Sequence, residues 1–328
     1  MPKIFVSTYP YSRTAKEPID LLRSTGWEIQ INPLGRKLKS LEVAELAHEF
    51  DGIIAGTEDL RPLIESSEKL KIISRVGIGL DSVPLGLCKE KSIVVTYTPD
   101  AVSMAVVELT IGLMVSLTRQ VVLADRQIRD GSWTRPYGKR IEESIIGIIG
   151  FGRIGSKVAK LLTVFKPRQV LVYDIKNKEP EITELKKSGL NIDFSSLNEI
   201  YTRSDIVTLH VPYSKLSRYM IDLKVFEKMK PDAYLINTAR GGIVREDHLY
   251  DAIKLKKIAG AAMDVFEEEP YHGQLIELEN VILLQHMGSC SYDCRLNMEF
   301  QAAEDMVNYF KGKPLINQVP EEEYAYQE

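Results

Sequence analysis

Short apolar runs rich in β-branched residues alternate along this chain with segments of helical periodicity, and this alternation restricts the fold more than any other feature. Parallel strands are joined by crossovers of a dozen or more residues, usually helices, so the alternation predicts parallel sheets covered by helices. In the first hundred residues the predicted strands are Lys3–Ser7, Trp27–Ile31, Gly52–Ala55, Ile72–Val76 and Ile93–Tyr97. The rhythm then restarts, and the later predicted strands are Ile145–Ile149, Val170–Tyr173, Ile206–Val211, Ala233–Asn237, Ala259–Asp264 and Val281–Leu284.

The point where the rhythm restarts predicts the domain organisation. A chain of 328 residues is long enough for two domains with separate cores. A long helix predicted from Ser103 to about Arg129 separates the two sets of strands, and Pro99-Asp100 before it is typical of a turn. Six later strands suit a complete Rossmann domain. The sequence therefore predicts an α/β protein with two doubly wound domains, of which the first is the smaller.

Two segments are predicted to lie outside the regular elements. Residues 131–138 form a loop by their Gly and Pro content, and we expect Trp133 and Tyr137 to pack this connecting loop. The acidic run Glu321–Glu323 near the end of the chain is expected to be a solvated terminus.

Composition and charge argue against several classes of protein. The formal net charge is -4 with basic residues spread along the chain, so no nucleic-acid partner is expected. No apolar run reaches the roughly 20 residues of a membrane span, and the N-terminus has the pattern of a first strand, not of a signal peptide. Cys88, Cys290 and Cys294 lack partners at metal-ligand spacing, so we expect reduced thiols, no metal and a cytoplasmic protein.

The strongest local motif is a glycine-rich turn that follows a strand and opens a helix. It reads Gly150, Phe151, Gly152, Arg153, Ile154, Gly155, a G-x-G-x-x-G placed directly after the strand Ile145–Ile149. The first glycine permits the tight turn, the second lets a pyrophosphate approach the backbone, and the third allows close packing of helix on strand. Asp174 ends the next strand 19 positions after Gly155, where a carboxylate binds the adenine ribose hydroxyls. These features predict an NAD site, although the nearby Lys176 leaves NADP open.

Three later segments carry groups suited to hydride transfer at a carbonyl. That reaction needs a proton donor, a group that tunes the donor, and a cation that orients the substrate and stabilises the developing alkoxide. Arg240 lies in Asn237–Gly242, a carboxylate cluster lies in Asp264–Pro270, and His286 lies in Gln285–Ser289. Each segment follows a predicted strand of the second domain, at the edge where doubly wound sheets bind ligands.

The order of the motifs G-x-G-x-x-G, N-T-A-R-G-G, D-V-F-x-x-E-P and H-x-G-S resembles that of the D-isomer-specific 2-hydroxyacid dehydrogenase family. The pattern is nearest to members that resemble phosphoglycerate dehydrogenase or hydroxypyruvate reductase. The resemblance extends over nearly the whole chain, including Arg75–Asp81 in the first domain and Val107–Thr110 on the long helix. It implies transfer of a hydride between NAD and C2 of a small D-2-hydroxy acid or its 2-oxo acid, with or without a phosphate.

The resemblance also implies roles for single residues. Arg240, Glu269 and His286 would be catalytic, with Glu269 as the partner of the acid/base His286. The loop Val76, Gly77, Ile78 would offer backbone N–H groups to the substrate carboxylate, and Arg75 could meet an anionic group. The cofactor would be bound by the glycine motif and Asp174 and by His210, Val211, Pro212, Thr238, Ala239, Asp264 and Gly288.

The family further implies a discontinuous first domain and a dimer. Residues 1–100 with 289–328 would form a flavodoxin-like substrate domain, and residues 101–288 the NAD-binding Rossmann domain. The final helix, from about Tyr292, would pack back on the first hundred residues, and two copies would associate through the NAD-binding domains to form a homodimer.

Departures from the family pattern leave the substrate and other functions open. Val102-Ser103 stands where many members have Asn-Ser, and Gln285 and Met287 flank the histidine. Members that resemble phosphoglycerate dehydrogenase have an arginine at the position of Ala55-Gly56-Thr57, and this chain lacks it. One alternative is an NAD-binding corepressor that acts through protein contacts, although we expect no appended disordered or basic segments. The other is a dehydrogenase of an inorganic or one-carbon substrate; Glu269 argues against a formate enzyme, in which Gln is typical at this position.

Overall fold

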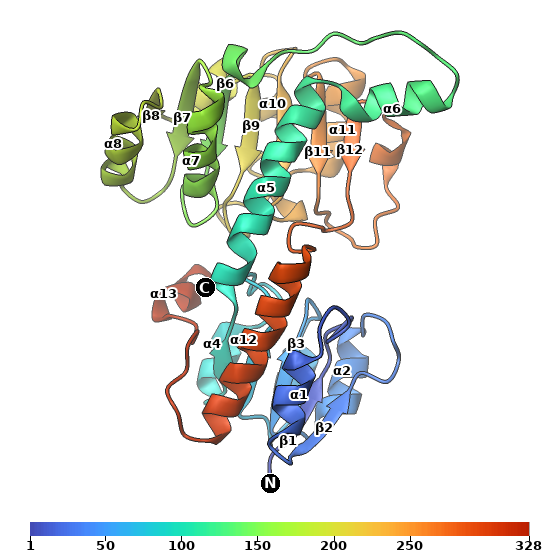
Figure 1. Ribbon diagram of the computed structural model, residues 1–328, viewed down its shortest axis with the longest axis vertical. Helices are drawn as coiled ribbons and strands as arrows, with labels where there is room; N and C mark the ends of the chain where they lie inside the picture. The colour runs from blue at the N-terminus through green and yellow to red at the C-terminus, as the bar shows by residue number, and fades with distance from the viewer. Residues whose placement is uncertain (328) are drawn as a thin grey trace. The chain divides into compact units, whose positions relative to one another are not determined.

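The computed structural model describes residues 1–327 and divides into two compact units. Unit 1 consists of residues 1–102 together with the residues from Ser289 onward, and unit 2 consists of Ser103–Gly288. Each unit is built on its own parallel sheet (Figure 1).

Unit 1 contains a five-stranded parallel sheet in the order β2-β1-β3-β4-β5. This is the flavodoxin-like order, so the predicted fold class of the smaller domain is confirmed. In the register of the sheet Val6 pairs with Ile54 and Ala55 with Arg75, which brings the carboxyl ends of β1, β3 and β4 to one edge. The strands are β1 (Lys3–Val6), β2 (Glu28–Ile31), β3 (Gly52–Ala55), β4 (Ile72–Arg75) and β5 (Val94–Thr96).

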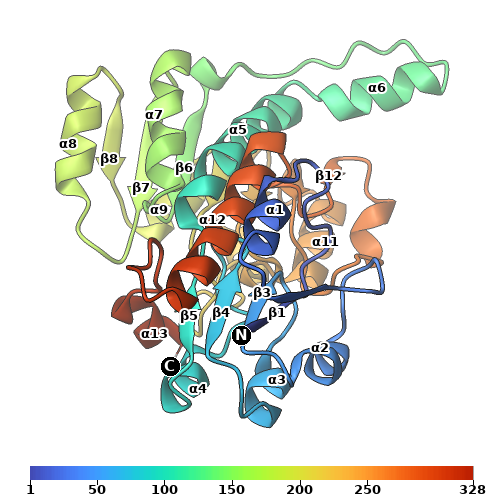
Figure 2. The same ribbon diagram turned by 60° about the horizontal axis from the view of Figure 1, so that its bottom comes forward.

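A helix from the end of the chain completes unit 1. Helix α12 (Tyr292–Phe310) packs beside α1 (Glu17–Arg23) and against β3 and β4 (Figure 2). A Cβ on Gly52 would lie 2.7 Å from Met306 Sδ, so the glycine leaves room for this methionine side chain of α12. The other helices of this unit are α2 (Ser40–Ala47), α3 (Arg61–Ser66), α4 (Leu85–Glu90) and α13 (Glu321–Gln327).

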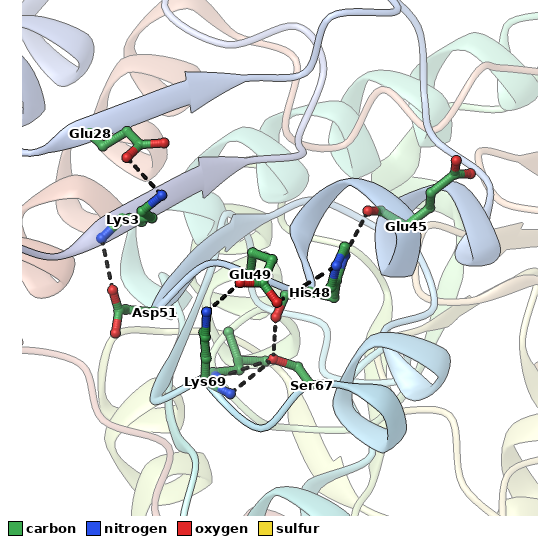
Figure 3. A network of polar contacts seen from close by, with 9 residues as sticks. Lys3, Glu28, Glu45, His48, Glu49, Asp51, Ser67 and Lys69 are labelled. Atoms are coloured by element: carbon green, nitrogen blue, oxygen red, sulfur yellow. Dashed lines mark hydrogen bonds and ion pairs between the residues drawn. The ribbon is translucent and has the colours of Figure 1, made fainter.

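The amino edge of the unit 1 sheet carries an exposed polar network (Figure 3). Lys3 donates from its backbone N to Asp51 at 2.9 Å, and its Nζ forms an ion pair with Glu28 at 3.0 Å. His48 contacts the backbone oxygen of Glu45 through Nδ1 at 2.8 Å, and its side chain is half exposed. Exposed pairs of this kind contribute about 0–1 kcal/mol each, so the network ties strand ends together without dominating stability.

Unit 2 contains a seven-stranded parallel sheet in the order β12-β11-β10-β9-β6-β7-β8. This is the Rossmann order with one further strand at the edge, which confirms the predicted fold class. The sequence missed β8, because its three residues Ile-Asp-Phe include a charged one and give too short a pattern. The strands are β6 (Ile145–Ile149), β7 (Gln169–Tyr173), β8 (Ile192–Phe194), β9 (Ile206–Leu209), β10 (Tyr234–Asn237), β11 (Gly260–Met263) and β12 (Val281–Leu283).

Helices cover the sheet of unit 2, and apolar side chains fill two clusters of buried residues, one around Leu209, Leu235 and Met263 and the other around Ile146, Ile148 and Leu162. Alternate residues of the strands, Ile148 and Ile149 for example, belong to different clusters because successive side chains point to opposite faces. The helices are α5 (Pro99–Thr118), which begins in unit 1, α6 (Val121–Arg129), α7 (Gly155–Phe165), α8 (Glu179–Lys187), α9 (Leu197–Arg203), α10 (Leu223–Phe226) and α11 (Glu246–Lys254), with single turns of 3-10 helix at Ile141–Glu143, Gly241–Ile243 and Gln274–Glu277.

The long helix predicted from Ser103 to about Arg129 is wrong at its start and in its continuity, whereas its end coincides with the last residue of α6. Pro99-Asp100 is not a turn but the start of α5, because proline is well tolerated in the first helical turn. The helix then breaks before α6, where Gln120 adopts the left-handed conformation with φ 53°. Helical periodicity continues across this break, which is why the sequence pattern did not show it.

Two other expectations also need correction. Trp133 and Tyr137 do not pack the connecting loop, since their exposed fractions are 78% and 95%. The acidic tail is not simply a solvated terminus: it forms α13, in which Glu321 pairs with Lys89 at 2.8 Å and Tyr324 packs on the unit 1 core.

Helix α5 also corrects the prediction about apolar runs. It is 20 residues long and apolar enough, by length and composition, to cross a membrane. Half of its most apolar window is buried inside the protein, and a helix that forms part of a protein core passes the same test.

Candidate active site

The predicted residues of unit 2 follow the carboxyl ends of its strands. The order of the strands reverses between β6 and β9, where open parallel sheets bind their ligands. Gly150 follows β6, His210 follows β9, Thr238 follows β10, Asp264 follows β11 and His286 lies three residues beyond β12. Parallel register therefore gathers residues that are up to 136 positions apart in the sequence along one edge.

The glycine motif has the geometry of a phosphate-binding turn. Gly150 has φ 94°, and a Cβ there would lie 2.5 Å from the backbone oxygen of His210. A Cβ on Gly155 would lie 2.0 Å from the backbone oxygen of Gly150, so only glycine allows α7 to start this close to the strand. Gly152 is exposed and a Cβ on it would meet nothing within 4 Å, so the backbone is open to a ligand at this point. Arg153 and Ile154 complete the turn before α7, whose N-terminal N–H groups favour an anion.

Asp174 ties the cofactor loop to the end of the neighbouring strand. Its Oδ2 accepts a hydrogen bond from the backbone N–H of Phe151 at 2.7 Å, and its Oδ1 accepts one from Lys176 N at 2.8 Å. The carboxylate is only partly buried and each oxygen has a second lone pair, so it can still accept hydrogen bonds from a ribose.

The loop after β9 contributes His210, Val211 and Pro212. His210 N donates to the backbone oxygen of Ile149 at 2.7 Å, which holds the loop beside the glycine turn. Burial lowers the pKa of His210 to about 3, so its ring is neutral near pH 7. His210 is therefore a lining residue of this edge and not an acid/base.

The turn after β10 is held by its own side chains. Asn237 accepts from Ala239 N at 3.0 Å through Oδ1 and donates through Nδ2 to the backbone oxygen of Arg240 at 2.8 Å. The buried Thr238 hydroxyl lies 3.2 Å from that of Thr110 on α5. Arg240 itself is partly exposed and its Nη1 donates to the backbone oxygen of Ala239 at 2.7 Å, which keeps the guanidinium at the strand end.

His286 and Glu269 form a hydrogen-bonded pair. His286 Nδ1 lies 2.9 Å from Glu269 Oε2 and 3.1 Å from Oε1, and about a third of each side chain is exposed. His286 adopts the left-handed conformation with φ 56°, which costs a non-glycine residue roughly 1–2 kcal/mol. A hydrogen bond from His286 N to the backbone oxygen of Asp264, 2.8 Å long, helps to hold it there. Strain of this kind is typical of functional sites.

Asp264 supports the loop that carries the histidine. It is almost fully buried, and it accepts hydrogen bonds from Met287 N at 2.6 Å and from Gly288 N at 2.8 Å. Burial raises the pKa of Asp264, while the two backbone donors favour its charged form. The residue therefore orients the segment after β12, in addition to its expected place beside the cofactor.

The sequence did not single out two residues that connect the arginine loop to the glutamate loop. Glu246 at the start of α11 accepts a hydrogen bond from Glu267 N at 2.7 Å, and Tyr219 donates its hydroxyl to Glu267 Oε2 at 2.6 Å. A Cβ on Gly241 would lie 1.9 Å from the backbone carbon of Phe266, so the loops touch through their backbones. The only sequence signal for this contact was the pair of glycines after Arg240, Gly241 and Gly242.

In unit 1, Arg75 is the last residue of β4, and the loop Val76–Ile78 follows it. Of the three amides expected to bind a carboxylate, Val76 N donates to Ala55 O at 2.9 Å and Gly77 N donates to Thr98 Oγ1 at 2.8 Å. Both are therefore engaged in the protein, and Ile78 is the one whose amide has no hydrogen bond within residues 1–327. The same described part of the chain contains no group of three or more His, Cys, Asp or Glu that could hold a metal ion.

Comparison with known proteins gives the family. Residues 111–288, more than half of the chain, match the sequence profile of the D-isomer specific 2-hydroxyacid dehydrogenase, NAD binding domain. The chain belongs to this family. The prediction of an NAD-dependent oxidoreductase of 2-hydroxy acids is confirmed at this level, and so is NAD as its cofactor.

Curated relatives of the enzyme include several activities. It is 35% identical over 325 residues to a glyoxylate reductase of Thermofilum pendens, and the alignment covers 95% of this chain and 92% of the relative. A hydroxypyruvate reductase of Thermotoga maritima is 32% identical over 81% of this chain and 87% of its own length. A D-3-phosphoglycerate dehydrogenase of Archaeoglobus fulgidus is 32% identical over 93% of this chain, but the chain spans only 57% of that relative.

Solved structures of similar fold extend over almost the whole enzyme. The TT0316 protein of Thermus thermophilus has a TM-score of 0.85 and 28% identity, covering 97% of this chain and all of that one. A D-lactate dehydrogenase of Aquifex aeolicus, solved with NAD and lactic acid, has a TM-score of 0.84 and 26% identity, covering 96% of this chain and 98% of that one.

Proposed function

We propose that this enzyme transfers a hydride between NAD(H) and C2 of a small D-2-hydroxy acid or its 2-oxo acid, with Arg240, Glu269 and His286 as its catalytic residues. The single observation that carries the proposal is the His286–Glu269 pair, with Nδ1 at 2.9 Å from Oε2, at the carboxyl edge of the sheet in unit 2. The segment that bears Glu269 also touches the loop after Arg240.

The residues present fit a nicotinamide dinucleotide. The open backbone at Gly152 and the start of α7 would hold the pyrophosphate, and Asp174 would accept hydrogen bonds from the adenine ribose and repel a 2′-phosphate. His210, Val211, Pro212, Thr238, Ala239 and Gly288 would line the rest of the cofactor site at the same edge. Bound NADH supplies the hydride that reduces C2 of the oxo acid.

His286 moves the proton. Its Nδ1 is directed at Glu269, so Nε2 is the nitrogen that gives a proton to the carbonyl oxygen during reduction and removes it during oxidation. The carboxylate of Glu269 lies at hydrogen-bonding distance from Nδ1 and so fixes the orientation of the ring. Arg240 presents a planar pair of donors to the substrate carboxylate and stabilises the negative charge that develops on the carbonyl oxygen.

We assign the substrate domain to residues 1–100 with 289–328 and the NAD-binding domain to residues 101–288. In the substrate domain, Ile78 N–H is the amide most suited to bind the substrate carboxylate, because those of Val76 and Gly77 are engaged. Arg75 would supply positive charge at the same strand end. This charge is compatible with a phosphorylated or an unphosphorylated substrate.

We also propose a cytoplasmic homodimer that associates through its NAD-binding domains and binds neither nucleic acid nor membrane. Helix α6 and the segment after it extend away from the sheet of unit 2 (Figure 2), no residue of α6 is buried, and Trp133 and Tyr137 are exposed. All three cysteines are reduced, and burial raises the pKa of Cys88 to about 12 and of Cys294 to about 11, so both remain thiols.

The decisive experiment replaces the histidine. His286→Ala should lower kcat for reduction of 2-oxo acids with NADH by roughly 10²- to 10⁴-fold, because the proton donor is lost. The dissociation constant of NADH, measured by fluorescence, should stay nearly unchanged. His272→Ala, at an exposed histidine of the same unit, serves as the control and should retain activity.

Two results would contradict the proposal. Turnover retained by His286→Ala would remove the histidine from the mechanism. A wild-type protein that binds NADH but reduces no member of a panel of 2-oxo acids would favour an NAD-binding corepressor.

A further inference from the structure

The sheet of unit 1 has its own topological switch point, between β1 and β3. From β1 the chain proceeds to β2 on one side, whereas β3 leads to β4 and β5 on the other. Open parallel sheets bind ligands outside the carboxyl ends of the strands at such a point. Thr8 follows β1 and Glu58 follows β3, so the two residues lie on either side of the switch.

Glu58 is buried in a way that a loop carboxylate seldom is. Its exposed fraction is 3%, and its Oε2 has no hydrogen-bond partner among residues 1–327. Leaving a buried acceptor without a donor is unfavourable, because the group has lost its hydrogen bonds to water and gained none from the protein. Such groups are rare in proteins, and a ligand that donates a hydrogen bond would satisfy this one.

The orientation of the carboxylate places it at the switch point. A Cβ on Gly56 would lie 2.8 Å from Glu58 Oε2 and 2.9 Å from Thr8 Oγ1. The two oxygens therefore lie against the same point of the backbone, directly after β3. Thr8 is also buried, with an exposed fraction of 4%, so both side chains face inward at this edge and not into solvent.

Arg75 lies at the end of the adjacent strand. Ala55 and Arg75 are partners in the β3–β4 register, and the guanidinium of Arg75 donates to the backbone oxygen of Val76. A Cβ on Gly77 would lie 2.3 Å from Arg75 Nη1, so the guanidinium lies over the Val76–Ile78 loop. Glu58 and the loop that we propose binds the substrate carboxylate therefore follow adjacent strands at the same edge of the sheet.

We propose that Glu58, with Thr8 beside it, accepts a hydrogen bond from a hydroxyl group on the carbon chain of the substrate. The inference rests on the proposed function and narrows it to hydroxylated, unphosphorylated 2-oxo acids. A hydroxyl donates to the carboxylate, a methyl group leaves it without a partner, and a phosphate is repelled by it. Sites that hydrogen-bond a substrate group discriminate strongly against analogues that lack it.

The test compares three substrates that differ only at C3: hydroxypyruvate, pyruvate and phosphohydroxypyruvate. With wild-type enzyme and NADH, kcat/KM for hydroxypyruvate should exceed that for each of the others by about 100-fold or more. In Glu58→Ala the preference for hydroxypyruvate over pyruvate should fall at least about tenfold, with kcat/KM for pyruvate little changed. Glu65→Ala, which removes an exposed carboxylate from α3 of the same unit, should keep the wild-type preference.

A second variant separates the hydrogen bond from the charge. Glu58→Gln has nearly the same shape and keeps an acceptor oxygen, so it should retain the preference over pyruvate. Its loss of charge should raise the relative kcat/KM for phosphohydroxypyruvate about tenfold or more. Glu58→Gln also tests the proposal should Glu58→Ala fail to fold.

The outcomes distinguish this inference from the function on which it rests. Reduction of all three substrates with ratios that neither Glu58 variant changes would overturn the role of Glu58 and leave the dehydrogenase intact. A wild-type enzyme that prefers phosphohydroxypyruvate would also overturn it. Absence of turnover with any 2-oxo acid would contradict the proposed function itself.

Discussion

At the scale of single residues, the glycine motif was the most informative part of the sequence. Gly150 lies in a left-handed turn, Gly152 leaves the backbone open, and Gly155 allows a close contact of the helix with the turn. Each environment matches the role that the spacing of the motif assigned to the residue. The additional bond from Phe151 N to Asp174 was not predictable, because the partners are 23 positions apart and meet only through the β6–β7 pairing.

Asp174 should determine the choice between NADH and NADPH. Replacing it with alanine removes the negative charge that repels a 2′-phosphate, and Lys176 remains nearby. We expect the ratio of kcat/KM for NADH to that for NADPH to fall at least about tenfold, as measured in steady-state assays with one 2-oxo acid. Asp193→Ala, which removes a carboxylate paired with Lys186 at 2.8 Å, is the control and should leave the ratio unchanged. A wild-type preference for NADPH would refute this role.

At the scale of elements, the important feature is how the loops after β10 and β11 are joined. Gly241 packs against the backbone of Phe266, and Glu246 from α11 accepts a hydrogen bond from Glu267 N. Arg240 and Glu269 are therefore held on loops that support one another. The sequence did not predict the bond between Glu267 N and Glu246, because the two residues are 21 positions apart. A charged residue at the start of a helix is usually expected to be exposed to solvent.

Glu246 should make stability depend on pH. Burial, and then the charges of Glu267 and Glu269, raise the pKa of Glu246 above its ordinary value of about 4.5. Between the unfolded and the folded pKa the folded chain binds more protons, so this residue lowers the free energy of unfolding as pH rises through that window. Glu246→Gln keeps an oxygen that can accept from Glu267 N but has no charge. Its melting temperature relative to wild type should therefore increase as pH rises from about 4.5 toward 7.

The exposed carboxyl of Glu227 in the same unit provides the matched comparison. The melting temperature of Glu227→Gln relative to wild type should not show this rise. A constant difference between Glu246→Gln and wild type across the pH range would show that this partly buried carboxyl does not affect stability in this way.

At the scale of the whole molecule, α6 and the segment after it carry several exposed apolar side chains of the NAD-binding unit. Ile128, Trp133 and Tyr137 are large apolar side chains that the unit itself does not cover. Exposed aromatic residues of this kind are enriched at protein interfaces. This feature supports the proposed homodimer more directly than the resemblance did, since the sequence assigned Trp133 and Tyr137 to packing within a loop.

Replacing two of these side chains should separate the copies. We expect wild-type protein to elute as a dimer in size-exclusion chromatography with light scattering, and Ile128→Ser combined with Trp133→Ser to raise the dissociation constant at least about 100-fold. Leu216→Ser, at another exposed apolar residue of the unit, should not change the mass. A monomeric wild type, or a double variant that remains dimeric, would contradict the proposal.

The sequence alone established the two sets of parallel strands, the dinucleotide motif and the chemical groups of the site. These features depend on local periodicity and spacing, which the order of residues records directly. Tertiary structure decided the break between α5 and α6, the edge strand β8, the supporting bonds from Glu246 and Tyr219, and the burial of Glu58. Those features depend on which segments the sheet register brings together. The string Gly-Thr-Glu-Asp after β3, for example, has the composition of a surface turn, and only its neighbours in the folded chain make Glu58 a buried residue.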